Sequence, residues 1–241
     1  LNFFFFFFFL QLSMLKRQKR NVPEIQPPEP KFIERVHSKH TSVSETDLKN
    51  TKKINKNLFK KMHSDYIYEI NFTKDSQLRQ ICQDSFVSLN LYSITFPPSL
   101  STIMPESFKG CQYLNDINFI NADFNENKLE IYDNAFHDTI IQSITIPKNT
   151  KKIYSSCFPK SLKNIEFENG GPKLEKVGNN LFCQTQIESF KFPTNYEIFI
   201  YPKNIFLHCK KLKTLIFDSY LNKSEKYQIG KDDEFYKKEK R

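Results

Sequence analysis

The side chains of this chain best suited to chemistry are its cysteines and histidines, which can act as nucleophiles or bind a metal ion. The 241 residues include five of each. The stretch ESFKGCQYL places Cys111 between Phe108 and Leu114, so its thiol could be reactive, disulfide-bonded or packed in a core. The cysteine count is odd and no C-x-x-C pair occurs, so a disulfide framework is not indicated. The cysteines are Cys82, Cys111, Cys157, Cys183 and Cys209.

Two histidine-containing pairs have spacings that a metal site can use. His37 and His40 form H-x-x-H, and His208 is adjacent to Cys209. Neither pair has a second half at zinc-finger spacing. We therefore predict no metal site.

Motifs of nucleophilic or phosphate chemistry do not occur either, since the sequence has no G-x-S-x-G, P-loop or H-E-x-x-H. Gly170 and Gly171 lie in ENGGPKL, where a turn with positive φ accounts for them. We predict a protein that is not an enzyme, with no catalytic or cofactor-binding residues, no cofactor and no small-molecule substrate. Asn71-Phe-Thr and Asn222-Lys-Ser match the N-glycosylation pattern, which matters only in a secreted chain.

The net charge of +9 is concentrated at the ends of the chain. Residues 1–61 hold 13 Lys and Arg against 5 Asp and Glu, whereas residues 62–219 hold 16 against 17. A basic segment can bind nucleic acid or an acidic membrane. Such a partner is therefore expected only through residues 16–61.

The two ends divide into four segments by composition. Residues 1–15 are a low-complexity apolar run with its basic cluster after it, the reverse of a signal peptide; we interpret the run as a start artefact or a membrane-associating segment. Residues 16–43 are a basic, proline-rich linker. Residues 44–65 begin with a pattern like a capping box and are expected to form a capping helix. Residues 220–241 are a charged tail that we expect to be disordered.

Residues 66–219 repeat one short pattern: an apolar residue, two others, an apolar residue, one other, then usually Phe or Ile. Alternation with a period of two predicts a short strand in each copy, with Ile94 and Phe96 of the stretch SITF facing inward. The copies are 21 to 27 residues apart and begin at Ile67, Leu91, Leu114, Ile141, Leu162, Ile187 and Leu212. The copy that begins at Leu114 is the longest, so NADFNEN (121–127) is expected to loop out.

A second pattern places Phe five residues after an Ile, Val or Tyr in every unit. One unit has too few apolar residues to close a core, but stacked units would place Phe over Phe in a continuous buried ladder. The ladder residues are Phe86, Phe108, Phe136, Phe158, Phe182 and Phe206. The two patterns together predict a β-rich repeat solenoid, a leucine-rich-repeat-like stack of about six and a half coils with a parallel sheet, flanked by disordered or partly helical ends.

The unit LYSITFPPSLSTIMPESFKGCQYL (91–114) resembles the BspA-like, bacterial-surface-antigen-type leucine-rich repeat, whose unit reads roughly LxxIxIPxxVxxIxxxAFxxCxxL. The resemblance covers residues 66–219. The family's Cys position holds Leu, Thr or Ser in other units, so we predict that Cys111 is a small buried packing residue. The glycine that often follows the second Ile of the family pattern survives only as Gly178.

The outward-facing strand residues are nearly all small or polar, and a stacked sheet would display them as two rows on one broad face. We predict that this face binds a partner protein of unknown identity. Its residues are Ser93, Thr95, Asp116, Asn118, Ser143, Thr145, Asn164, Glu166, Ser189 and Lys191.

The resulting hypothesis is a non-catalytic protein–protein interaction module. The family resemblance implies a surface antigen or adhesin in some members, with host or matrix proteins as partners, and an intracellular scaffold with the same solenoid stays open. The alternative hypothesis is a nucleic-acid or acidic-membrane binder that uses its basic N-terminal segment and keeps the repeats as a scaffold.

Overall fold

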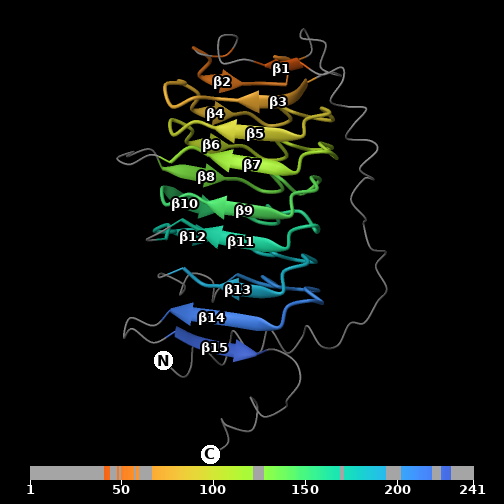
Figure 1. Cartoon of the computed structure of the whole chain (residues 1–241), viewed down its shortest axis with the longest axis vertical. Helices are drawn as coiled ribbons and strands as arrows, with labels where there is room; N and C mark the ends of the chain where they lie inside the picture. Colours follow the sequence, from red (N-terminus) through yellow and green to blue (C-terminus); the bar gives the residue numbers. More distant parts are fainter. Residues whose placement is uncertain are drawn as a thin grey trace, which may run out of the picture.

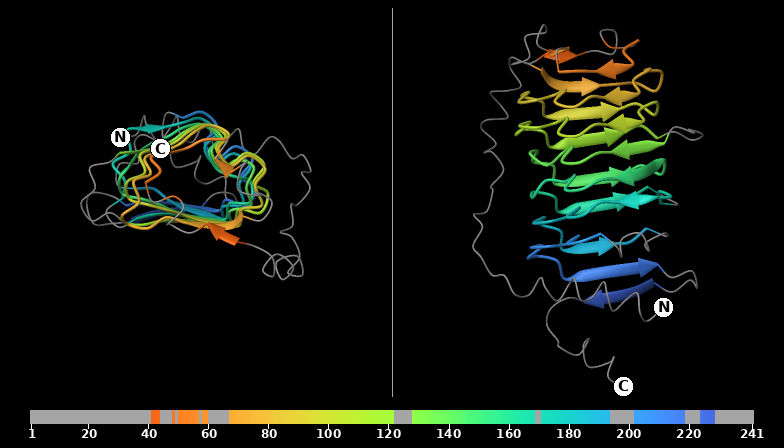
Figure 2. Two further views of the ribbon diagram at one scale, coloured as in Figure 1. Left: turned by 90° about the horizontal axis from the view of Figure 1, so that it is seen from above. Right: turned by 180° about the vertical axis from the view of Figure 1, so that it is seen from behind.

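The computed structural model is a solenoid in which the chain winds through successive coils (Figure 1). Viewed from above, the coils superpose into one flattened ring, and their strands form the walls of the stack (Figure 2). The prediction of a parallel-sheet repeat solenoid is confirmed. The structure describes residues 41–43, 48, 50–56, 58–59, 67–121, 128–168, 171–193, 202–218 and 224–228.

One wall, which we call the first wall, consists of strands stacked along the whole solenoid. Hydrogen bonds join them as three sheets, in the orders β1-β3-β5-β7, β9-β11 and β13-β14-β15. All pairs are parallel except β14 with β15. The strands are β1 (Thr41–Val43), β3 (Ile67–Asn71), β5 (Ser93–Phe96), β7 (Asp116–Phe119), β9 (Ser143–Ile146), β11 (Asn164–Phe167), β13 (Ser189–Lys191), β14 (Thr214–Asp218) and β15 (Ser224–Gln228).

The second wall is one six-stranded parallel sheet in the order β12-β10-β8-β6-β4-β2. Five of its strands contain the Ile or Val that precedes a ladder phenylalanine by five residues, and in β2 Ile54 precedes Phe59 in the same way. Its strands are β2 (Lys53–Ile54), β4 (Gln80–Ile81), β6 (Thr102–Ile103), β8 (Leu129–Ile131), β10 (Thr150–Ile153) and β12 (Lys176–Val177).

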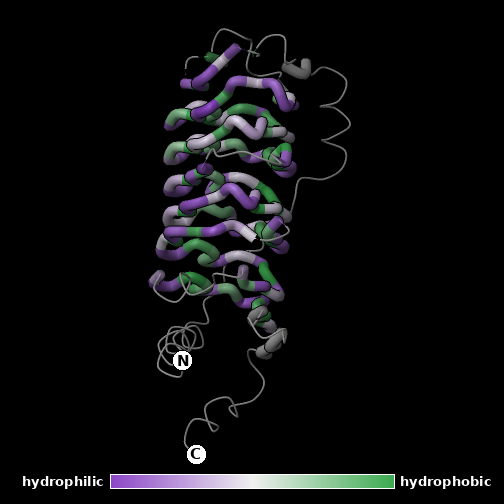
Figure 3. Tube along the Cα trace, turned by 90° about the vertical axis from the view of Figure 1, so that its left-hand side faces the viewer, coloured by the Kyte–Doolittle hydropathy of each residue, from purple (hydrophilic) through white to green (hydrophobic). Residues whose placement is uncertain are grey.

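Strand alternation places the apolar residues of both walls in a shared core. In β5, Ile94 and Phe96 are fully buried while Ser93 and Thr95 are partly exposed, as the sequence predicts. Prolines follow the strands where the ladder of hydrogen bonds must stop, as Pro97 does after β5 and Pro147 after β9. Apolar and polar residues recur at similar places in successive coils when the solenoid is seen from the side (Figure 3).

The predicted phenylalanine ladder is buried, with each of its six side chains at most 3% exposed. The rings stack in two runs, from Phe86 through Phe108 to Phe136 and from Phe158 through Phe182 to Phe206. Centroid separations within these runs are 4.6 to 5.6 Å, which suits offset stacking.

The turn before each ladder phenylalanine reverses the chain through a left-handed residue. The residue two positions before each Phe has φ between 52° and 58°, a region that Asn and Asp tolerate better than most residues. Four of the six positions hold Asn or Asp. The six are Asp84, Glu106, Asn134, Ser156, Asn180 and Asn204.

The capping helix expected over residues 44–65 is wrong as a single element, because β2 lies inside that range and pairs with β4. Phe59 also stacks on Phe86, with 5.2 Å between ring centroids. Ile54 and Phe59 therefore form an earlier copy of the Ile-to-Phe pattern. Burial against the neighbouring coil outweighs the local helix signal there.

The charged tail also differs from expectation, because residues 224–228 form β15, which pairs antiparallel with β14. Residues 41–43, taken as part of the linker, form β1 beside β3. The apolar run 1–15, the linker up to residue 40 and the expected loop at 122–127 lie outside the described residues.

Candidate partner-binding surface

Cys111 is fully buried, and the structure confirms that its role is packing. Its thiol donates a hydrogen bond to the backbone oxygen of Phe86 in the preceding coil, with 2.8 Å between the heavy atoms. Burial raises the pKa of this thiol to about 12, so the reactive thiolate does not form near neutral pH. All five cysteines are free of disulfide bonds.

Other side chains at the repeat position of Cys111 also donate a hydrogen bond to a buried backbone oxygen. Thr139 and Thr185 each donate a hydrogen bond to the backbone oxygen of the ladder phenylalanine three residues earlier. Cys209 donates to the backbone oxygen of Phe182, and burial raises the pKa of its thiol to about 12. At these three units a small side chain at this position satisfies a buried carbonyl, whereas Leu89 fills the same position by apolar packing alone.

In the part of the chain that it describes, the structure does not gather the other candidate residues from the sequence, the histidines and glycines, into a site. Among the described residues, no three His, Cys, Asp or Glu side chains are grouped as a metal site would need. His37 and His40 lie outside those residues, as do Gly170 and Asn222. Gly171 has φ of 62°, in agreement with the predicted turn. Within the described part of the chain, no helix is long and apolar enough to span a membrane.

The ten residues predicted to form the binding face all lie on the outer side of the first wall. Eight of them are exposed, and the other two, Ser93 and Thr95, are partly exposed. Adjacent strands hold them in register, since Ser93 lies opposite Asp116 and Thr95 opposite Asn118. Strand alternation thus produces two parallel rows of small and polar side chains.

The same two rows continue on the later coils. Ser143 of β9 lies opposite Asn164 of β11, and Thr145 lies opposite Glu166. Further along, Ser189 and Lys191 of β13 pair with Thr214 and Ile216 of β14. In Figure 1 β7 and β9 lie next to one another, as do β11 and β13, so the rows run along most of the solenoid.

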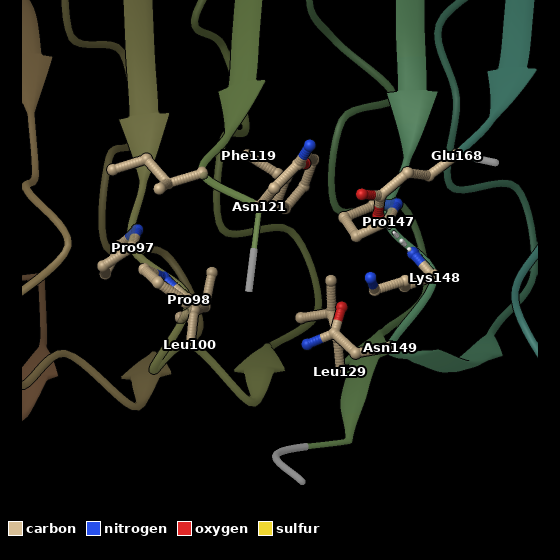
Figure 4. A pocket seen from close by; sticks show the side chains of 11 residues that line it. Pro97, Pro98, Leu100, Phe119, Asn121, Leu129, Pro147, Lys148, Asn149 and Glu168 are labelled. Atoms are coloured by element: carbon tan, nitrogen blue, oxygen red, sulfur yellow. Dashed lines mark hydrogen bonds between the residues drawn. The ribbon is translucent and has the colours of Figure 1, made fainter. Parts of the chain in front are cut away.

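A shallow pocket lies at one edge of this face, where β5, β7 and β9 end (Figure 4). Pro97, Phe119 and Pro147 give it an apolar lining, and the backbone N–H of Lys148 donates a hydrogen bond to Glu168 beside it. Its volume is about 20 Å³, which is room for about one water molecule. The pocket is too small for a substrate or cofactor.

Sequence reasoning missed a cluster of aromatic and charged side chains on the second wall. Tyr132 and Tyr154 stack with 4.4 Å between ring centroids, and the Lys176 ammonium lies 4.4 Å from the Tyr154 centroid. Glu130 accepts a hydrogen bond from the Tyr132 hydroxyl and pairs with Lys152. This hydrogen bond raises the pKa of Tyr132 to about 12, whereas the bond from Lys152 lowers the pKa of Glu130.

The sequence contains a signal for this cluster. Tyr132 and Tyr154 both directly follow the Ile that precedes a ladder phenylalanine by five residues, so stacked coils must place them side by side.

The sequence matches the family described as the BspA type leucine rich repeat region, in six copies over residues 32–158 and 129–231. The chain belongs to this family, whose repeats generally serve as protein-interaction scaffolds and occur in surface proteins. The matched range begins earlier and ends later than the 66–219 inferred from the sequence, in keeping with β1, β2 and β15. No curated protein matches the chain.

Three solved structures match the chain. A leucine rich cell surface protein from Faecalibacterium prausnitzii A2-165 is 18% identical with a TM-score of 0.51, and the match covers 70% of this chain and 43% of that protein. The pneumococcal vaccine antigen PcpA is 19% identical with a TM-score of 0.40, covering 63% and 48% of the two chains. A leucine-rich repeat protein from Bacteroides ovatus is 18% identical with a TM-score of 0.37, covering 73% and 58%.

Sequence identities of 18–19% show similarity of fold alone. The chain spans less than two thirds of each of the three proteins.

Proposed function

We propose that this protein is a non-catalytic interaction module that binds a partner protein along the outer face of its first wall. The observation that carries the proposal is the pair of rows of small and polar side chains, which adjacent strands hold in register within each of the three sheets of the first wall. Such a flat surface presents hydrogen-bonding groups at the regular spacing of adjacent strands, about 4.8 Å. Solenoids commonly bind along extended surfaces of this kind.

More specifically, we propose a role as a surface antigen or adhesin. It is supported by the family to which the chain belongs and by the names of two similar structures, a cell surface protein and a vaccine antigen. The alternative, binding of nucleic acid or an acidic membrane through residues 16–61, depends on a segment that lies mostly outside the described residues.

The test compares two matched double variants of the full chain as bait for proteins from the cells that make it and from their surroundings. Asn118→Arg/Thr145→Arg adds two charges and bulk to the face, and Val87→Arg/Gln112→Arg adds the same to exposed turns. We expect mass spectrometry to find a protein that wild type and the turn variant retain and the face variant loses. If every captured protein is retained equally by the face variant, the proposed face is wrong.

A further inference from the structure

The outer side of the second wall differs in chemistry from the proposed binding face. One row on it is formed by the residues that directly follow the inward Ile of β4, β6, β8 and β10, namely Cys82, Met104, Tyr132 and Tyr154. Their backbone N–H groups donate to the oxygen of the corresponding Ile one coil earlier, with N···O distances of 2.8 to 2.9 Å. All four side chains are partly exposed. Successive coils therefore present a continuous apolar and aromatic strip.

A charged row runs beside this strip. Thr102 lies opposite Glu130, and Lys152 lies between Glu130 and Lys176 in the ladder of strands. Lys152 and Glu130 form an ion pair of 2.8 Å. Lys176, on the next strand, lies over the Tyr154 ring, and within the described residues it forms no ion pair with a carboxylate.

The charge around this strip favours the binding of an acidic partner. Besides Lys152 and Lys176, two further lysines flank the strip, and both contact Glu175, with N···O distances of 4.0 Å for Lys128 and 3.8 Å for Lys151. Asp133, which directly follows Tyr132, accepts a hydrogen bond from the Ser155 N–H and adds a third carboxylate to Glu130 and Glu175. The four lysines therefore exceed the carboxylates by one positive charge. The exposed charges of the predicted binding face on the first wall are Asp116, Glu166 and Lys191, so that face has no excess of positive charge.

We propose that the row of Met104, Tyr132 and Tyr154, together with Lys152 and Lys176, is a second interaction surface that binds an acidic, extended segment of a partner protein. Tyrosine and methionine are enriched in the centres of protein interfaces. Tyrosine gives a large contact area at little entropic cost, and the flexible methionine side chain adapts to the shape of a partner. Stacking holds both tyrosine rings in place before a partner arrives, and the cation–π contact does the same for the Lys176 ammonium.

The geometry of the rings argues for a peptide and against single-stranded nucleic acid. A base must stack on an open aromatic face. One face of the Tyr154 ring is covered by Tyr132 from the preceding coil, and the other by Lys176 from the following coil. Glu130 and Glu175 would also repel a phosphate backbone, whereas a peptide can place its carboxylates selectively beside Lys176.

The test measures fluorescence anisotropy of a short fluorescein-labelled peptide of glutamate and leucine residues with the full chain and its variants. Lys152→Gln/Lys176→Gln removes two charges from the surface. Lys163→Gln/Lys213→Gln removes two exposed charges that lie just before β11 and β14. We expect the first variant to weaken binding by at least about tenfold and the second by less than about twofold.

A second variant, Tyr132→Ser/Tyr154→Ser, removes both rings without changing the number of lysines. We expect it to weaken binding by about threefold to tenfold, measured at a temperature at which circular dichroism shows the variant to be folded. If the lysine double variant fails to fold, Lys176→Gln alone replaces it, since this side chain is exposed.

Three results would overturn the proposal. The first is no binding of the peptide by wild type, and the second is equal loss of binding in the two lysine variants. The third is tighter binding of labelled oligothymidine that is weakened by the same surface variants, which would assign the surface to nucleic acid. Tyr132, Tyr154, Lys152 and Lys176 all lie on or directly after strands of the second wall, so the effects of their variants do not bear on the function proposed for the first wall.

Discussion

The rings of Phe86 and Phe108 stack with centroids 4.6 Å apart and planes 7° apart, although the two residues belong to different coils. Both rings are fully buried, and each covers one face of the other. The core is thus shared between units, and no coil can be stable by itself. A change at one ladder position should therefore affect the whole stack.

The ladder predicts that Phe136→Ala will destabilise the protein strongly. Its ring is fully buried and stacks on Phe108 with 5.2 Å between centroids, so truncation removes buried area and leaves a cavity. We expect the free energy of unfolding to fall by about 3–5 kcal/mol, measured by chemical denaturation. Val87→Ala, at a side chain 41% exposed, should change it by less than about 0.5 kcal/mol. Equal stabilities of the two variants would contradict the ladder.

The ladder and the first-wall strands could be predicted because both depend on short local periods. All seven copies of the strand pattern form strands, beginning with β3 and ending with β14. Alternation alone placed Ile94 in the core and Ser93 outside it, since a strand has only two faces. The outward rows of the candidate site follow from the same alternation.

Elements whose partners are distant in sequence could not be placed in the same way. Ile54 and Phe59 have the spacing of the Ile-to-Phe pattern, but they lie among lysines and asparagines that resemble a helix. Only the contact with Phe86 shows that they belong to the solenoid. Similarly, β15 has no strand pattern of its own, and its pairing with β14 defines it.

A buried hydroxyl predicts a stabilising substitution. Thr150 is fully buried at a position where other units hold Leu, and its Oγ1 has no hydrogen-bond partner among the described residues. Thr150→Val should raise the free energy of unfolding by about 1–2 kcal/mol, because an unpaired buried hydroxyl is costly.

The matched control is Thr139→Val, which removes a hydroxyl that donates to the backbone oxygen of Phe136. This variant should lower the free energy of unfolding by about 1 kcal/mol. Chemical denaturation of both variants gives the comparison. A lower free energy of unfolding in both variants would mean that the Thr150 hydroxyl does form a hydrogen bond.

Close contact between two coils predicts that Gly178→Ala will be destabilising. A Cβ at this position would lie 2.4 Å from the backbone N of Ser155 and from the carbonyl C of Tyr154. Since backbone atoms must shift to relieve this contact, we expect a loss of about 1–3 kcal/mol in denaturant unfolding. Tyr154 and Met104 carry side chains at the equivalent position of earlier coils, so the close approach is particular to the coils of Gly178 and Ser155. A Gly178→Ala variant as stable as wild type would show that the two coils are not held this closely.

Burial of the thiols predicts their reactivity with a disulfide reagent. Cys82 and Cys183 are partly exposed and should react in the native protein, whereas Cys111, Cys157 and Cys209 should react only after unfolding. Counting modified thiols by mass spectrometry near neutral pH checks this. Rapid modification of Cys111 in the folded protein would contradict its place in the core.

The raised pKa of Cys111 also predicts how stability depends on pH. The thiol stays protonated in the folded protein up to a pH of about 12, whereas in the unfolded chain its pKa is about 8.5. Folding is therefore favoured fully below the unfolded pKa, and this contribution is lost as the pH rises toward the folded pKa. Cys111→Val should make the free energy of unfolding less sensitive to pH over this interval. An unchanged pH dependence would mean that Cys111 contributes nothing to it.

The antiparallel pairing of β15 with β14 predicts that the tail protects the end of the stack. Ending the chain after Asp218 removes β15 and leaves the outer edge of β14 without its partner. Because an unpaired strand edge can pair with another chain, we expect this truncation to self-associate, measured by light scattering after gel filtration. Ending the chain after Gly230 keeps β15 and should leave the association state of the full chain unchanged. If both truncations have the same association state, β15 does not act as the cap.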